Sequence, residues 1–238
     1  MHPRGGASSD GRSSRRRAVH IVVAAFLLGL TVGGLLRGHV ASHRTPINPA
    51  AAVTGRSDGA SVATARESNG APAGFANSEA GAVAAAAAFV TTGQQLLNMD
   101  PLAAEDAVRQ MAAAASADAQ VVETLGKLSA AREVLAQGTG PIVYRQSAIA
   151  WKLEGFTPAR ARVAIWNVSV LSRVGIATPQ AGWAISTLDL VWEREGWRIW
   201  SETISPGPAP VLDDSTAPAT SEQLDAALTG FSDFGAAK

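Results

Sequence analysis

The chain has no cysteine, and its four histidines all lie before residue 44. Without cysteine it cannot form a disulfide bond, a thiolate metal site, a cysteine nucleophile or a lipidated lipobox. Without histidine, the rest of the chain lacks the commonest general base and the commonest metal ligand. We therefore expect no catalytic residue, no bound cofactor and no metal site.

The chain carries no net charge, but its basic and acidic side chains are unevenly spread. Residues 1–17 hold five arginines and one aspartate, whereas residues 78–238 hold 11 basic and 17 acidic side chains. A nucleic-acid-binding domain would be positive, so we expect no direct sequence-specific binding of nucleic acid. A basic tail before an acidic body is instead typical of a chain threaded through a membrane.

Residues 18–36 follow three consecutive arginines and contain no charged side chain. A helix of that length spans roughly 30 Å, the thickness of the hydrocarbon core of a bilayer. Arginines at its start place that end in the cytoplasm. The sequence thus predicts a basic cytoplasmic tail (1–17), a single transmembrane helix (18–36) and an extracytoplasmic remainder, anchored in the lipid bilayer of the cell membrane.

A cleaved signal peptide is the alternative interpretation of this segment. The apolar run is longer than the usual signal-peptide core, and the one small-residue exit places His39 where a small side chain is required. Ala25, Gly29 and Gly33 recur every fourth residue and so share one helix face, where a second helix could approach closely. Such spacings also arise by chance in membrane helices.

Two segments around the central region have compositions that do not support a core. Residues 37–74 are rich in Ala, Ser, Gly, Thr and Pro and predict a flexible linker to a folded domain at 75–204. Residues 205–238 begin with closely spaced prolines and predict a tail. Its stretch 221–231 has apolar residues at helical spacing, which indicates either a docking helix or a loosely packed end.

The first half of the folded domain predicts three helices. Asn77 or Ser78 can cap the first, which runs through an alanine-rich stretch to about residue 98. Asp100 followed by Pro101 is a capping residue before a proline at the first helical position, which predicts a second helix to about residue 115. A third begins at residue 116 or 117 and ends near Gly138.

The second half predicts strands. Residues 142–153, 161–173, 182–193 and 197–204 are rich in β-branched and aromatic side chains and are separated by turns. Helices first and closely connected strands last predict an α+β domain with three helices packed on a curved, four-stranded antiparallel sheet.

Aromatic and polar side chains of these strands are the candidates for a pocket. All six tryptophans lie between Trp151 and Trp200, where they either fill the concave side of the sheet or form a ligand platform. Four residues could line such a pocket: Tyr144, Trp166, Trp183 and Asp189. Of these, Tyr144 and Asp189 are the one pairing to consider for isomerase-like proton transfer.

Arg160 and Arg162 share one face of a predicted strand. They could contact an acidic partner, and a solvated strand end explains them equally well.

The predicted element order resembles the nuclear transport factor 2-like (cystatin-like) cone. Its closing stretch 188–200, in which a hydrophobic strand turns through an acidic Gly-Trp pair, resembles the last hairpin of many such domains. Placed after one membrane helix and a linker, the domain resembles the bitopic inner-membrane scaffold proteins of type IV secretion and conjugation systems.

That resemblance implies a function without catalysis. The chain would be a membrane-anchored assembly subunit of a conjugative transfer channel, contacting other membrane subunits and copies of itself. The high usage of Ala, Arg and Gly separately indicates a GC-rich, actinobacterial host. Two alternatives stay open: an accessory membrane protein of an import system, or a domain that binds a small ligand or isomerises it in a hydrophobic pocket.

Overall fold

The computed structural model describes residues 66–68, 70–210 and 219–234 of the chain. Among them, no helix combines the length and the hydrophobicity that crossing a bilayer requires. The predicted membrane segment 18–36, with its face of Ala25, Gly29 and Gly33, lies outside these residues.

Three helices form the first layer of the domain. A short hairpin of β1 (Arg66–Ser68) and β2 (Ala71–Ala73) precedes α2 (Glu79–Leu96), α3 (Pro101–Met111) and α4 (Ala117–Leu135). The Ser78 hydroxyl accepts from Gly81 N at 3.1 Å and caps α2. The Asp100 carboxylate accepts from Leu102 N at 2.9 Å and caps α3, whose first residue is Pro101.

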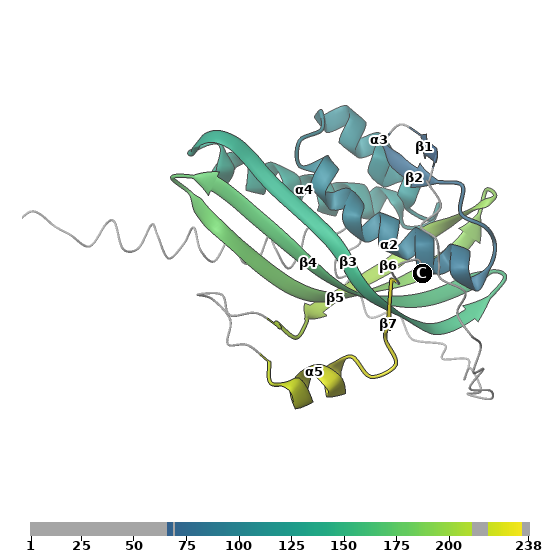
Figure 1. The fold of residues 1–238 in the computed structure, drawn as a ribbon. Helices are drawn as coiled ribbons and strands as arrows, with labels where there is room; N and C mark the ends of the chain where they lie inside the picture. Colours follow the sequence, from purple (N-terminus) through teal and green to yellow (C-terminus); the bar gives the residue numbers. More distant parts are fainter. Residues whose placement is uncertain (1–65, 69, 211–218, 235–238) are drawn as a thin grey trace, which may run out of the picture.

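Four long strands and one short strand form the second layer (Figure 1). They are β3 (Thr139–Thr157), β4 (Arg160–Val174), β5 (Ala177–Glu193), β6 (Gly196–Pro206) and β7 (Ser232–Asp233). The sheet is antiparallel in the order β6-β5-β4-β3-β7. The turn between β5 and β6 places Arg194 at φ 50° and Glu195 at φ 61°, the positive values that tight hairpins require.

The predicted count of elements is wrong. Within the described residues the sheet has five strands rather than four, and there are four helices rather than three. The additions to the predicted domain come from the C-terminal segment (residues 219–234). Its helix α5 (Ser221–Ala227) lies in the stretch 221–231, whose apolar spacing indicates a helix in the predicted tail, whereas β7 was not predicted. β7 pairs with β3 at one edge of the sheet, and β6 forms the other edge. The last two strands in the sequence, β6 and β7, therefore lie at opposite edges.

The main core lies between the helices and one face of the sheet. Alanines of α2 pack there with side chains such as Val163, Ile165 and Leu188, and small residues let the helix approach the strands closely. We call this the helix-covered face, and the face turned away from α2, α3 and α4 the distal face. Figure 1 shows α5 on the distal side.

The six tryptophans divide between the two faces rather than all filling the concave side. Trp151, Trp192 and Trp197 pack against the main core. Trp166 and Trp183 stack on each other with ring centroids 5.1 Å apart, and the strand register places them on the distal face. Trp200 is 40% exposed.

Candidate functional site

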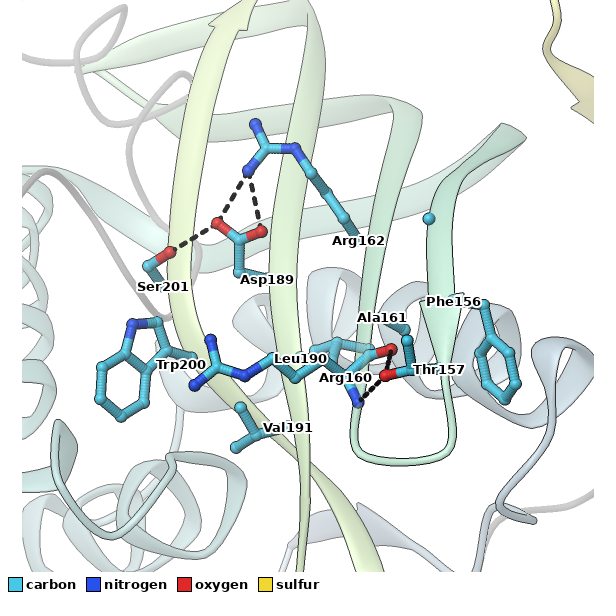
Figure 2. A pocket seen from close by; sticks show the side chains of 11 residues that line it. Phe156, Thr157, Arg160, Ala161, Arg162, Asp189, Leu190, Val191, Trp200 and Ser201 are labelled. Atoms are coloured by element: carbon cyan, nitrogen blue, oxygen red, sulfur yellow. Dashed lines mark hydrogen bonds and ion pairs between the residues drawn. The ribbon is translucent and has the colours of Figure 1, made fainter. Parts of the chain in front are cut away.

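A groove of about 580 Å³ opens at one end of the distal face (Figure 2). Its walls come from the β3–β4 turn and from β4, β5 and β6, and include Thr157, Arg160, Arg162, Asp189 and Trp200. Arg160 pairs with Val191, and Arg162 with Asp189, so these four side chains lie on the same face of the sheet. We call this surface the Arg160–Trp200 groove.

A β-bulge presents Trp200 to this groove. Leu190 pairs with Ile199 and Asp189 pairs with Ser201, so Trp200 is an extra residue in β6 with no partner in β5. Ile199 before it is 1% exposed and faces the core. A bulge changes the direction of a side chain, and here it holds a large apolar ring at the surface beside polar neighbours.

The segment between α3 and α4, together with the start of α4, fixes the bulge from the outer edge of β6. Ala113 N donates to the Ile199 carbonyl at 2.8 Å, and Gln120 Nε2 donates to the same carbonyl at 2.9 Å. Gln120 is 5% exposed and also reaches the Trp200 carbonyl at 3.4 Å. These bonds hold the backbone carbonyls of Ile199 and Trp200, so the backbone of the bulge is fixed where it presents Trp200.

The Arg160 guanidinium lies over the Trp200 ring, 5.8 Å from its centroid. This is a cation–π arrangement, which orients both side chains. The Thr157 hydroxyl accepts from Arg160 N at 3.0 Å and fixes the turn that carries the arginine. Among the described residues, the Arg160 guanidinium has no carboxylate partner.

Arg162, by contrast, is bonded to two carboxylates. Its Nη1 lies 2.8 Å from both Asp189 oxygens, and its Nε lies 2.9 Å from Glu154 Oε2. Burial lowers the pKa of Arg162, but the bonds and charges of Asp189 and Glu154 outweigh it and raise the pKa overall. Asp189 also accepts from the Ser201 hydroxyl at 2.9 Å, so this carboxylate is already engaged.

Arg198 adds positive charge beside the groove. Val191 pairs with Arg160 on one side and Arg198 on the other, so both arginines lie in one row across the sheet. Burial lowers the pKa of Arg198, and the positive charge of Arg194 lowers it further, while Glu193 acts in the opposite direction. Within the described residues neither Arg160 nor Arg198 makes an ion pair, so a negative group could pair with either of them at this end of the sheet.

The four residues predicted to line a pocket do not come together. Trp166, Trp183 and Asp189 lie on the distal face, whereas Tyr144 is 1% exposed on the helix-covered face. Asp189 lies in the Arg160–Trp200 groove, and the tryptophan pair lies farther along the same strands. Within the described residues there is also no cluster of three or more metal-binding side chains.

A hydrogen-bonded polar network surrounds Tyr144 inside the domain. The Tyr144 hydroxyl donates to Gln146 Oε1 at 3.3 Å, Gln146 Nε2 donates to Asn167 Oδ1 at 3.3 Å, and Asn167 Nδ2 donates to Ser186 at 3.3 Å. All four residues are at most 6% exposed. In the sequence this network is visible only as three polar residues, Gln146, Asn167 and Ser186, at core positions of strands. Hydrophobic periodicity alone does not predict that they bond to one another.

Because Tyr144 is buried, we expect the domain to lose stability in alkaline solution, where the phenol ionises. Burial raises its pKa, the Glu202 charge raises it further, and a hydrogen bond from Ser169 acts in the opposite direction. The pKa of Tyr144 in the folded state lies above the unfolded value of about 10. The contribution of the neutral phenol to the free energy of unfolding is therefore complete below about pH 10 and is lost as pH rises through the folded pKa. Tyr144 is the one tyrosine of the chain, so phenolate absorbance reports it alone.

In the unmodified chain we expect phenolate absorbance to rise at the pH at which the far-ultraviolet circular dichroism is lost. In Tyr144→Phe we expect the free energy of unfolding to depend less on pH above about 10. A phenol that titrates near its unfolded value while the domain stays folded would contradict the burial of Tyr144.

These features define an α+β domain: three helices on one face of a five-stranded antiparallel sheet, with a groove at the end of the other face. The chain belongs to the family described as Domain of unknown function (DUF8175), whose model matches residues 48–220. No curated protein matches the chain. The intermembrane space region of the chloroplast protein ARC6 is similar at 14% identity, with a TM-score of 0.26, over 36% of this chain and 71% of that chain. Neither match bears on the resemblance to type IV secretion scaffolds or nuclear transport factor 2-like domains.

Proposed function

We propose that this domain is a non-enzymatic assembly module that binds a partner subunit through the Arg160–Trp200 groove. The observation that carries the proposal is Trp200, an exposed tryptophan that a bulge places at the surface. Arg160 lies over its ring and has no carboxylate partner among the described residues. Tryptophan and arginine are the residues most enriched at the energetic centres of protein interfaces.

The geometry around these two residues favours binding over catalysis. Gln120 holds the backbone of the bulge, which fixes the direction in which the Trp200 side chain leaves the strand, and Arg160 lies over its ring. The groove carboxylate, Asp189, accepts bonds from Arg162 and Ser201, which is the arrangement of a structural ion pair rather than of a free base. The polar network at Tyr144 is bonded internally and belongs to the core.

The partner surface that fits the groove is acidic with an apolar centre. A carboxylate would pair with Arg160, and an apolar side chain would cover Trp200 and Val191. We further propose that residues 18–36 anchor the domain outside the cell membrane and that its partners are other membrane subunits of a conjugative, type IV secretion-like channel. That part rests on the order of segments in the sequence. A lipid-import operon beside the gene would favour the import alternative.

Photo-crosslinking at position 200 tests the proposal. A photoreactive phenylalanine derivative is placed at Trp200 of the full chain in its native host, and at Leu102 as the control. Leu102 is also an exposed apolar residue, at 73%, but it lies on α3 on the other side of the sheet. We expect adducts from position 200 to a subunit encoded beside the gene, and few from position 102. Equal yields from both positions would refute a binding groove.

A further inference from the structure

The outer edge of β6 is open beyond the bulge. Within the described part of the chain, β6 pairs with β5 and with no other strand. Ala112 forms an isolated parallel bridge to Ile199, and Ala113 N donates to the Ile199 carbonyl at 2.8 Å. The chain then enters α4. The segment between α3 and α4 thus adds one bridge to this edge and none at residues 201–206.

The register of the ladder shows which backbone groups of this stretch point outward. Gly207 N donates to the Trp183 carbonyl at 2.9 Å, so these two residues form a hydrogen-bonded pair. The register continues without a shift along residues 201–206. Bonded and non-bonded pairs alternate in an antiparallel ladder, so Ser186 and Ile204 form a non-bonded pair. The Ile204 N–H and C=O therefore point away from β5, and no other residue that the structure describes bonds to them.

This stretch of β6 carries few of the features with which proteins block an exposed edge. Residues 201–205 include no lysine, arginine or proline. Their one charged side chain, Glu202, is 3% exposed and so presents no charge at the surface. The β3 edge differs, because it carries Pro141, Arg145 and Lys152 in addition to its pairs with β7. β6 is therefore the less protected edge of the sheet.

The open edge is continuous with the Arg160–Trp200 groove. Trp200 directly precedes the edge along β6, and Ser201 belongs both to the edge and to the wall of the groove. The Ser201 hydroxyl donates to Asp189 on the distal face. Alternation along the strand places Thr203 and Ser205 on that face as well, and both are exposed. A strand added here would therefore share the distal face with the groove.

From these observations we infer that the partner subunit presents an extended segment, which adds to the outer edge of β6 as a further strand and continues over the groove. The inference rests on the proposed function and specifies how that partner is recognised. The segment carries an apolar side chain over Trp200 and an acidic one toward Arg160, because Arg160 lies over that ring and makes no ion pair within the described residues.

An added strand accounts for features of β6 that the folded domain leaves incomplete. It bonds to the outward N–H and C=O of Ile204 and covers the Ile204 side chain, which is half-buried. Recognition of this kind takes its affinity from main-chain hydrogen bonds and its specificity from side-chain pockets beside the edge. The groove supplies such a pocket. A partner that contacted Trp200 alone would leave the Ile204 backbone groups unbonded.

Ile204→Pro tests the added strand without changing the groove. Proline removes the outward N–H, and an edge position whose N–H takes no part in the ladder tolerates proline. Ile204→Val is the matched control, because it keeps that N–H and shortens the same side chain slightly. In the full chain we expect the dissociation constant for the subunit that crosslinks at position 200 to rise roughly tenfold in Ile204→Pro and about twofold or less in Ile204→Val.

Crosslink mapping is a second measurement, which decides the matter even if Ile204→Pro does not fold. The photoreactive phenylalanine derivative is placed at Thr203 and, separately, at Ser205. We expect adducts to partner residues about two positions apart, in the segment that position 200 also marks. Adducts to separate segments or to a second copy of the chain, or unchanged affinity of folded Ile204→Pro, would overturn the added strand. The groove proposal fails separately, if Trp200→Ala leaves the affinity unchanged.

Discussion

Replacing Trp197 by alanine is expected to lower the free energy of unfolding by about 3–5 kcal/mol. The side chain is 1% exposed, and its ring centroid lies 5.2 Å from that of Trp192 and 6.0 Å from that of Phe156. Its indole Nε1 donates to the Ala76 carbonyl at 2.9 Å, which ties the start of α2 to the last hairpin. Alanine would leave a large cavity and remove one of the two hydrogen bonds that the Ala76 carbonyl accepts, the other coming from Ser78 N.

Denaturant unfolding, followed by circular dichroism, measures this effect. A small domain has only about 5–15 kcal/mol of stability, so the variant would unfold at a much lower denaturant concentration. Trp200→Ala is the matched control, because it removes the same side chain three residues along the same strand but at the surface. We expect a change of about 1 kcal/mol or less there. Similar losses from both variants would contradict the division of tryptophans between core and surface.

The helix starts could be predicted from the sequence because their signals are local. Asp100 before Pro101 indicates a cap and a first helical residue, and α3 begins at Pro101 with the Asp100 side chain bonded to Leu102 N. β7 could not be predicted in this way. Ser232 and Asp233 have no strand propensity of their own, and they pair only because the folded chain brings them to the edge of β3.

The candidate site was accessible to sequence reasoning in part. The spacing of Arg160 and Arg162 indicates a shared face, and the register shows both in the groove. Arg162 differs from Arg160 because it bonds to Asp189 and Glu154. Asp189 lies 27 residues away in the sequence, so sequence spacing does not indicate this contact. Trp200 could not be assigned, because strict alternation along β6 takes no account of a bulge that adds one residue. Residues 18–36 stay a prediction.

Trp200→Ala is expected to weaken association with the partner at least thirtyfold while the domain stays folded. A tryptophan at the centre of an interface typically contributes 2 kcal/mol or more, and about 1.4 kcal/mol changes the dissociation constant tenfold. The loss should be large here because alanine removes both the apolar surface and the ring on which Arg160 rests. Arg160 would then have to be ordered by the partner.

The affinity of Trp200→Ala for the subunit that crosslinks at position 200 is the most direct measurement of the groove's role. It is compared with that of Leu102→Ala, which removes another exposed apolar side chain on the other side of the sheet. We predict a dissociation constant at least thirtyfold higher for Trp200→Ala, and no more than a twofold change for Leu102→Ala. Folded Trp200→Ala that binds as tightly as the unmodified chain would contradict the assignment of this groove as the partner-binding surface.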